Sequence, residues 1–533
     1  MRIVRIGRSS TELHPADEIG AKAANLARMA ALGLSVPPAF VLPISLCADI
    51  IARSSHAERD LRDGLKEGIE FLETESGKRF GDRRQPLLVS VRSGAARSMP
   101  GMLETVLDVG CTSAAVRGLI QTTGRPRLAW DCRRRFLESF GQTVLGLDPA
   151  HFAALLSELV DREGVASDRG LDSEALERLA AKEQAMIEEH DEWLEDAVTQ
   201  LEQAARAVYR SWTSERSQTY RKLQKLNDLR GTAVTVQAMV FGNGGLASGA
   251  GVAFSRDPST GAASPMIDLL LDAQGEDVVS GRSTPNAEEE IAHTLPAINA
   301  ELSDILKRLE REFGDVQDVE FTVEDGKLWI LQTRAAKRTP RAAVRIAIDL
   351  VNEGVITAEQ ALERTSDIDV ASLTEISLVS PGEPVASGIG ASAGIGVGRA
   401  AFDSEAARRL CDTGEPVILL RPDTSTSDVS GFAVAAGIVT TVGARTSHAA
   451  LVARQMGKPC VVGCGEMRID FDGRKARLGN ATLAEGDWVT IDGSSGRLYL
   501  GRCKFAANAP EADLAEIARW RSRVGTQCLS AAG

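Results

Sequence analysis

Residues 318–334 read DVEFTVEDGKLWILQTR, two runs of alternating apolar and polar residues around a central Asp-Gly. Strand side chains repeat with period two, so each run predicts a strand with one apolar face. The apolar faces agree if Val319 pairs with Leu331, which leaves residues 324–326 as a three-residue loop. A two-residue Asp-Gly turn would instead pair Val319 with Gln332 and mix the faces. The pattern therefore predicts a β-hairpin with the longer loop.

The second face of this hairpin collects four polar side chains, Asp318, Glu320, Gln332 and Arg334. Three oxygen-bearing side chains suit Mg²⁺, which prefers hard oxygen ligands shared with phosphates. The planar fork of Arg334 suits a phosphate group. The alternative is a solvated sheet face that holds an ion pair.

Residues 242–251, GNGGLASGAG, lie between two apolar runs of strand length. Five glycines in ten residues allow backbone N–H groups to approach an anion closely, so the segment can form a loop over nucleotide phosphates. The alternative is a flexible hairpin connection. The segment matches neither the Walker loop nor the dinucleotide fingerprint.

Two basic residues stand where phosphate ligands commonly bind. Lys22 falls just inside a helix expected from Gly20 to Gly33, where the helix dipole favours anions. Arg92 follows the apolar strand LLVSV and is expected to lead the loop RSGAARSMPGM. Ligands of α/β proteins tend to bind beside such strand ends.

The segment TTVGARTSHAALVARQMGKPCVVG, residues 440–463, predicts a strand, a glycine turn and a helix. Thr446 or Ser447 can cap that helix, which places His448 in its first turn. A phosphate on the imidazole would face free N–H groups and the positive end of the dipole. His448 is therefore a candidate nucleophile, with Arg445, Thr446 and Ser447 as candidate phosphate contacts. The alternative is a histidine packed at a domain surface.

Composition places these motifs in a multidomain globular chain. The 533 residues correspond to three or four domains, and the hydrophobic and charged fractions of 43% and 25% are those of ordinary globular proteins. The formal charge of −13 argues against nucleic acid as the main partner. No secretory h-region or apolar stretch of about 18 residues is present, and the eight cysteines are scattered. We therefore expect a cytoplasmic protein without a membrane or nucleic-acid partner.

Taken together, six segments resemble the pyruvate, phosphate dikinase family. They occur in that family's order and cover residues from about 10 to 502. The segments are GAKAANLARMAALGLSVPPAF, LLVSVRSGAARSMPGMLETVLDVG, AVTVQAMVFGNGGLASGAGVAFSRDPSTG, AQGEDVVSGRSTP, VEFTVEDGKLWILQTRAAKRT and TSHAALVARQMGKPCVVGCGE.

The resemblance implies a multidomain α/β and α+β protein. An ATP-grasp nucleotide-binding module with a helical insertion would precede a swivelling β/β/α phosphohistidine domain. The expected boundaries are an ATP-grasp N-terminal subdomain at 1–110, a helical insertion at 111–200, a nucleotide- and metal-binding subdomain at 201–340, a helical linker at 341–385, the phosphohistidine domain at 386–503 and a tail at 504–533.

The resemblance also implies a reaction and its residues. ATP would be split to AMP, the β-phosphoryl group would move to His448, and the γ-phosphoryl group would go to inorganic phosphate or water. The catalytic residues implied are His448, Arg92 and Arg334. Those implied to hold ATP are Lys22, Arg92, Gln237, Met239, Val240, Gly249, Ala250, Gly251, Glu276 and Arg334. Those implied to hold Mg²⁺ are Asp318, Glu320 and Gln332.

Two motifs depart from the family pattern. The family reads Thr-Arg-Gly-Gly-Met-Thr-Ser-His before the carrier, whereas this chain has Val442 in place of the arginine and gains Arg445. The Gly-Glu-Phe strand of the family is represented by residues 267–269, with Asp268 as a shorter carboxylate, and the arginine that follows is displaced to Arg282.

The family continues into a barrel that binds pyruvate and phosphoenolpyruvate, whereas this sequence stops about thirty residues after the phosphohistidine domain. We therefore expect the final acceptor on a separate chain. Alternatives are a dikinase-type phosphotransferase with another small-molecule acceptor, such as the rifampin-modifying enzymes, or an idle ATP-binding regulatory module.

Overall fold

The computed structural model describes residues 2–8, 12–97, 99, 102–165, 167–190, 195–279, 291, 293–368, 373, 375–423, 429–445, 447–508 and 510–530. The chain divides into two units. The first unit comprises Met1–Gly244 and Leu328–Thr333, and the second comprises Gly245–Lys327 and Arg334–Gly533. The chain therefore passes from the first unit to the second within the glycine-rich segment.

A five-stranded sheet organises the first unit, with the strand order β1-β2-β7-β5-β6 and antiparallel pairing throughout. Its strands are β1 Val4–Ile6, β2 Ala39–Leu42, β5 Val89–Ala95, β6 Thr105–Val109 and β7 Thr232–Ala238. The short strands β3 Arg79–Phe80 and β4 Pro86–Leu87 pair in parallel beside it. The neighbours β5 and β7 are far apart in sequence because a helical segment lies between them.

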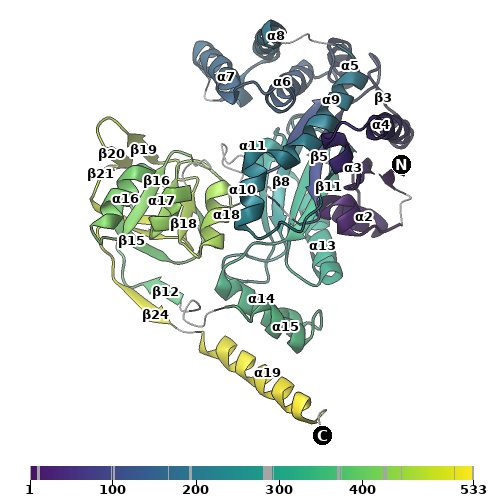
Figure 1. The fold of residues 1–533 in the computed structure, drawn as a ribbon. Helices are drawn as coiled ribbons and strands as arrows, with labels where there is room; N and C mark the ends of the chain where they lie inside the picture. The colour runs from purple at the N-terminus through teal and green to yellow at the C-terminus, as the bar shows by residue number, and fades with distance from the viewer. Residues whose placement is uncertain are drawn as a thin grey trace. The chain divides into compact units, whose positions relative to one another are not determined.

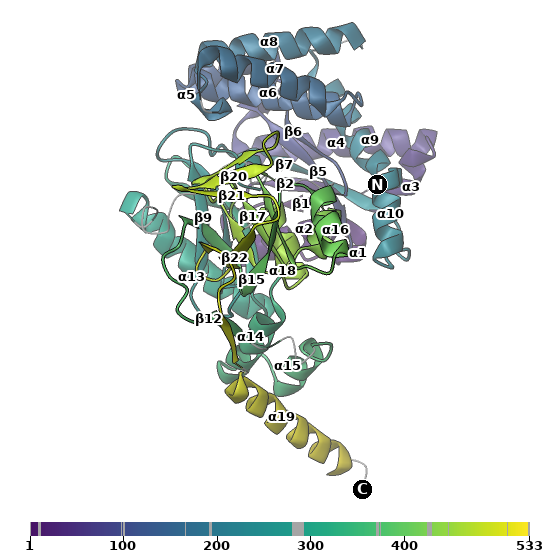
Figure 2. The ribbon, with the colours of Figure 1, turned by 90° about the vertical axis from the view of Figure 1, so that its left-hand side faces the viewer.

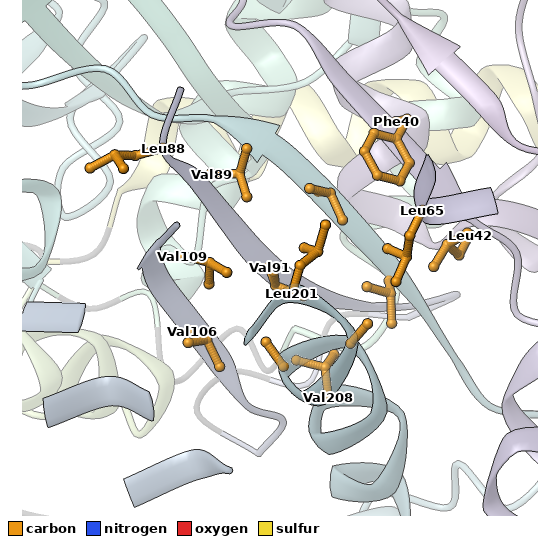
Figure 3. Close-up of a cluster of buried hydrophobic side chains, with 14 of the residues drawn as sticks. Phe40, Leu42, Leu65, Leu88, Val89, Val91, Val106, Val109, Leu201 and Val208 are labelled. Carbon is orange, nitrogen blue, oxygen red and sulfur yellow. The ribbon is translucent and has the colours of Figure 1, made fainter. Parts of the chain in front are cut away.

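Helices cover this sheet and extend beyond it. They are α1 Ala16–Ile19, α2 Ala21–Ala31, α3 Leu46–Ile51, α4 Ser55–Ser76, α5 Ser113–Thr123, α6 Pro126–Thr143, α7 Pro149–Glu163, α8 Ser173–His190, α9 Ala197–Arg210 and α10 Glu215–Leu223, with single 3₁₀ turns at Asp168–Gly170 and Ser211–Thr213. Figure 3 shows the core where Leu201 and Val208 of α9 pack against Val91 and Val106 of the sheet. Helices α6, α7 and α8 pack together around smaller clusters of their own (Figure 1).

The second unit begins with a sheet of order β11-β10-β8-β9. Its strands are β8 Gly249–Phe254, β9 Met266–Leu271, β10 Gln317–Glu324 and β11 Lys327–Ala335. The helices of this part are α11 Gly275–Val279, α13 Pro296–Phe313, α14 Pro340–Asn352 and α15 Ala358–Arg364. Residues of β8, α14 and α15 share one buried apolar cluster.

An eight-stranded sheet follows, with the order β13-β23-β22-β15-β16-β17-β18-β14. Its strands are β13 Ala386–Ser387, β14 Ile389–Ser392, β15 Ile395–Ala401, β16 Val417–Arg421, β17 Gly437–Thr440, β18 Cys460–Val462, β22 Trp488–Asp492 and β23 Arg497–Leu500. Strands β15 to β18 run parallel, and α16 Ser404–Asp412, α17 Val429–Val434 and α18 His448–Gln455 lie between them in the chain. A small sheet is formed by β19 Met467–Asp470, β20 Lys475–Leu478 and β21 Ala481–Ala484.

The segments that enter and leave this part of the chain pair with each other. Strand β12, Glu375–Leu378, which is labelled in Figures 1 and 2, is antiparallel to β24, Phe505–Asn508, which is labelled in Figure 1. Leu378 lies opposite Phe505 in this pair. The chain ends in α19, Glu511–Ser530. Ile517 and Trp520 of α19 are buried in the same cluster as α14. The β12–β24 ribbon therefore leads back to the helices that follow the first sheet of this unit.

The structure confirms the expected mixed α/β, multidomain architecture. The seven cysteines whose side chains are described are all free thiols. Within the described residues, no helix is both long and apolar enough to cross a membrane.

Candidate functional site

The start of α2 is fixed against β5 in the first unit. Gly20 precedes the helix with φ 81°, and a Cβ atom at this position would lie 2.2 Å from the carbonyl oxygen of Gly94. Only glycine permits this approach. Lys22 is exposed as the second residue of the helix, as the sequence predicted. The close contact therefore holds the helix N-terminus, and with it Lys22, beside the strand that carries Arg92.

Arg92 lies inside β5 and does not lead a loop, because the strand continues to Ala95. It stands opposite Thr235 of β7, and its Nη1 donates to Oε1 of Gln237 at 3.3 Å. Gln237 is buried and also donates from Nε2 to the carbonyl of Pro37. The adjacent strands β5 and β7 thus bring together a predicted phosphate ligand and a predicted adenine neighbour.

The two other residues implied for the adenine follow directly after β7. The backbone N–H of Met239 donates to the carbonyl of Leu88 at 2.9 Å. Met239 is half-buried and Val240 is buried. Both residues therefore belong to the first unit, together with Lys22 and Arg92.

The structure corrects the prediction that residues 249–251 form part of a phosphate loop. Gly249, Ala250 and Gly251 are the first residues of β8, an inner strand flanked by β9 and β10. A Cβ atom on Gly251 would lie 2.4 Å from the Phe321 ring and 2.5 Å from the carbonyl oxygen of Asp268. This glycine is needed for packing inside the sheet, and the irregular segment ends before it.

The hairpin turn also differs from the prediction. Glu324 belongs to β10 and Lys327 to β11, so the turn has two residues, Asp325 and Gly326, with φ values of 50° and 76°. Two left-handed residues are typical of the type I′ turn, whose twist matches that of the strands. The three-residue loop was wrong because turn geometry outweighed the match of the apolar faces.

Asp318, Glu320 and Arg334 nevertheless converge, as predicted. Nε of Arg334 lies 2.8 Å from Oδ2 of Asp318, and its Nη1 lies 3.7 Å from Oε1 of Glu320. Burial raises the pKa of Asp318, and Arg334 opposes that rise. Burial lowers the pKa of Arg334, but the two carboxylates outweigh it and the net pKa is raised. The cluster is therefore an ion-pair network set into the sheet.

The cluster offers two carboxylates of the kind that hard cations prefer, although no group of three or more His, Cys, Asp or Glu side chains suited to a metal ion occurs among the described residues. Asp318 is 1% exposed, and its Oδ1 accepts no hydrogen bond from the described residues. An unpaired buried carboxylate oxygen beside Glu320 offers the ligand type that Mg²⁺ prefers. Gln332 is buried in the part of β11 that belongs to the first unit. Glu276 is exposed in the first turn of α11.

His448 begins α18, as the sequence predicted. Ser447 caps this helix, since its Oγ accepts a hydrogen bond from the N–H of Ala450 at 3.4 Å. The turn before it contains Gly443 at φ 125°, and the N–H of Ser447 donates to the carbonyl of Ala444. The first N–H groups of α18 are the usual orphan donors of a helix N-terminus. Thr446, the other predicted cap and phosphate contact, lies outside the described residues.

The two sequence departures meet in the second unit. The backbone N–H of Arg445 donates to Oδ2 of Asp268 at 3.1 Å, and its Nη1 donates to Oδ1 at 3.2 Å. Asp268 is 3% exposed. Burial raises its pKa, and Arg445 counteracts the rise. The arginine gained at 445 therefore pairs with the shortened carboxylate at 268. Arg282 lies outside the described residues.

Sequence reasoning missed Arg454, which follows His448 in α18. It is 1% exposed, and its Nη1 and Nη2 donate to the carbonyls of Ala391 and Arg445. Its guanidinium lies 5.4 Å from the centre of the Phe254 ring. Burial lowers its pKa, whereas Asp318 and Asp268 are among the charges that raise it. A single charged residue in an otherwise apolar stretch, AALVAR, was the available signal.

Comparison with known proteins identifies two domains. Residues 51–301 and 287–354 match the family described as pyruvate phosphate dikinase, AMP/ATP-binding domain. Residues 413–496 match the mobile domain of PEP-utilising enzymes.

Full-length relatives agree with the domain matches. The chain is 40% identical over 518 residues to pyruvate, phosphate dikinase of Clostridium symbiosum, which covers 95% of this chain and 59% of the relative. It is 40% identical to the chloroplastic pyruvate, phosphate dikinase 1 of Arabidopsis thaliana, over 97% of this chain and 54% of the relative. For the pyruvate, phosphate dikinase of Rhizobium meliloti the identity is 40% and the shares are 96% and 59%. The chain thus spans between half and two thirds of these relatives.

Proposed function

The chain belongs to the pyruvate phosphate dikinase family, and from this premise we propose that it is an ATP-dependent phosphotransferase with His448 as its phosphoryl carrier. The observation that carries the proposal is the occurrence, in one unit, of the Asp318–Glu320–Arg334 cluster and of a histidine at a capped helix N-terminus. The first is suited to hold phosphates and a cation, and the second to carry a phosphoryl group.

We assign ATP binding to the residues that the family resemblance implies. Lys22, Arg92 and Arg334 supply positive charge for the triphosphate, and Arg92 and Arg334 stabilise the charge that develops during transfer. Gln237, Met239 and Val240 border the adenine. This assignment is supported by the contact of Arg92 with Gln237 and by the placement of Arg334 on the carboxylate cluster.

We assign Mg²⁺ binding to Asp318, Glu320 and Gln332. The cation would neutralise phosphate charge as the phosphoryl group is transferred. The support for this assignment is the unpaired, buried Oδ1 of Asp318 beside Glu320. Glu276, exposed on α11, remains a candidate for the nucleotide site.

In the proposed reaction an imidazole nitrogen of His448 forms a bond to the β-phosphorus of ATP, and the bond from that phosphorus to the AMP oxygen breaks. The γ-phosphoryl group passes to inorganic phosphate, which gives pyrophosphate, or to water. The phosphoryl group on His448 then moves to pyruvate, the substrate in the names of the relatives, or to another acceptor on a separate chain. The N–H groups at the start of α18 stabilise the phosphohistidine.

The proposal is tested with ATP labelled separately at the β- and γ-phosphorus. With Mg²⁺ and inorganic phosphate, the β label should appear on the protein as acid-labile phosphate, while the γ label should be released as pyrophosphate, or as phosphate if water is its acceptor. The variant His448→Ala should lose the label, and His151→Ala, which removes an exposed histidine of α7, should keep it. Label that persists in His448→Ala would refute the carrier assignment. ATP binding without AMP release would favour an idle nucleotide-binding module.

Transfer to the acceptor is measured by a chase. The labelled protein is mixed with pyruvate alone, and then with pyruvate and a separate acceptor domain from a full-length relative. Label in phosphoenolpyruvate identifies pyruvate as the acceptor, and the comparison of the two arms shows whether a second chain is needed. Retention of the label in both arms would exclude pyruvate.

A further inference from the structure

The glycine-rich segment is attached to the helical part of the first unit through Asn243. Its Nδ2 donates to Oδ2 of Asp131 in α6 at 2.7 Å, and both residues are 4% exposed. We propose that Asp131 is a positioning residue, which fixes the first-unit end of the glycine-rich segment through Asn243 and thereby sets the affinity for ATP. The link to ATP rests on the proposed function and on the expectation that this segment lies over the nucleotide phosphates, whereas the restraint on the segment rests on neither.

Asp131 is held as a charged acceptor. Arg134 Nη2 donates to its Oδ1 at 2.8 Å, and Arg135 Nε donates to its Oδ2 at 2.9 Å. Burial alone would raise the pKa of Asp131, but the two guanidinium groups outweigh it and the pKa is lowered. A hydrogen bond from an amide to an ionised carboxylate is stronger than one between neutral groups. The contact to Asn243 is therefore a firm anchor.

The other end of the segment is held separately, in the second unit. The N–H of Gly245 donates to Oδ1 of Asp272 at 2.9 Å. Ser248 Oγ accepts from the N–H of Asp325 at 3.0 Å, and the carbonyl of Ala247 accepts from the N–H of Gly326 at 2.8 Å. The chain passes from the first unit to the second between Gly244 and Gly245, directly after the Asn243 anchor.

These anchors limit the part of the segment that can rearrange. Residues 241–244 are buried, while Leu246 is 79% exposed and Ala247 is also exposed. Loss of the Asn243 anchor would lengthen the unrestrained stretch. Ordering a longer stretch on a bound nucleotide costs more conformational entropy, which weakens binding. The helical insertion thus acts on the nucleotide through a buried hydrogen bond.

The test compares Asn243→Ala, Asp131→Asn and the double variant in the full chain. Glu138→Gln is the matched control, because Glu138 also accepts from Arg134 on the same helix, at 3.3 Å, while the substitution leaves both partners of the Asp131–Asn243 hydrogen bond in place. The Kd for ATP, the kcat of histidine phosphorylation, the Tm and hydrogen exchange of residues 241–248 are measured. Asn243→Ala should raise the Kd about tenfold, change kcat less than about twofold and speed exchange in the segment.

The double variant separates positioning from stability. In the Asn243→Ala background, Asp131→Asn should leave the Kd unchanged, yet it should still lower the Tm because two buried arginines lose their partner. The proposal would be overturned if Asn243→Ala kept the wild-type rate of hydrogen exchange and the wild-type Kd for ATP. It would also be overturned if the Kd for ATP rose in proportion to the loss in Tm in every variant, including Glu138→Gln. Faster exchange in Asn243→Ala supports the anchor even if the wild-type protein forms no phosphohistidine, an outcome that would refute only the proposed function.

Discussion

Arg445 lies three residues before His448, the proposed carrier, and the structure identifies its partner. Arg445 uses both its backbone N–H and its guanidinium to bind Asp268. Asp268 is 3% exposed. A buried carboxylate without a partner is strongly destabilising, so the contact with Arg445 stabilises Asp268.

The contact between Arg445 and Asp268 leads to a prediction. Arg445→Glu should lower the rate of His448 phosphorylation by more than about tenfold, because a second carboxylate would face the buried Asp268. ATP affinity should stay within about threefold, since Lys22, Arg92 and Arg334 are unchanged. Rapid-quench labelling and calorimetry measure the two quantities.

Two further variants serve as a rescue and as a control for this experiment. Asp268→Arg combined with Arg445→Glu should restore part of the lost rate, although the backbone hydrogen bond to Asp268 is not recovered. Arg468→Glu reverses an exposed charge in the same unit and should have no effect. A full rate in Arg445→Glu would show that the pair has no role in transfer.

At the scale of elements, the capped helix at His448 was predictable and the hairpin turn was not. Capping depends on neighbouring residues, so the sequence narrowed the cap to Thr446 or Ser447, and the structure has Ser447. At Asp325 and Gly326, the Asp-Gly sequence favours a two-residue turn, whereas the pairing of apolar faces favours a three-residue loop. The sequence prediction followed the apolar faces and was wrong. Arg92 was placed in a loop for a similar reason, because no local signal in the sequence marks the end of β5 at Ala95.

Contacts between distant segments could not be predicted at all. Arg445 and Asp268 are 177 positions apart, and Asn243 and Asp131 are 112 positions apart. A single sequence carries no information on which of many charged residues will meet across such distances. Arg445 and Asp268 were named individually from the sequence, whereas their pairing and the contact of Asp131 with Asn243 required the fold.

Gly251 provides a test of the corrected view of β8. Gly251→Ala should destabilise the second unit by about 1–3 kcal/mol, since its Cβ would collide with the Phe321 ring and a strand carbonyl. Gly465→Ala is the matched control, because a Cβ there meets no atom within 4 Å. Urea unfolding measures both, and Phe321→Leu should recover part of the loss. Unchanged stability would contradict the packing role.

At the scale of the whole molecule, the first unit has a buried acid that makes stability depend on pH. Glu183 of α8 is 1% exposed, and its Oε2 has no hydrogen-bond partner among the described residues. Burial raises its pKa well above the ordinary range, Arg134 lowers it, and Glu138 and Asp131 raise it further. Glu183 is therefore protonated in the folded state at pH values where the unfolded chain is ionised.

The raised pKa of Glu183 gives the pH dependence a defined sign. A folded-state pKa above the unfolded value stabilises the protein fully below the unfolded pKa, and the contribution is lost as pH rises through the folded pKa. Glu183→Gln should remove this dependence, so its Tm relative to wild type should increase from pH 5 to pH 9. Glu188→Gln on the same helix, where the residue is exposed, should leave the pH profile unchanged. Parallel profiles for wild type and Glu183→Gln would refute the assignment.

The β12–β24 ribbon bears on whether the segment between its two strands could be removed from the chain. Leu378 and Phe505 face each other across an antiparallel pair, where opposite Cα atoms are about 5 Å apart. The segment between them, which includes α18 and His448, therefore has two neighbouring ends. A tight turn would be enough to rejoin the chain if the segment were removed. A domain with adjacent ends can be gained, lost or exchanged in evolution with changes confined to its contacts with the rest of the unit, such as Asp268–Arg445.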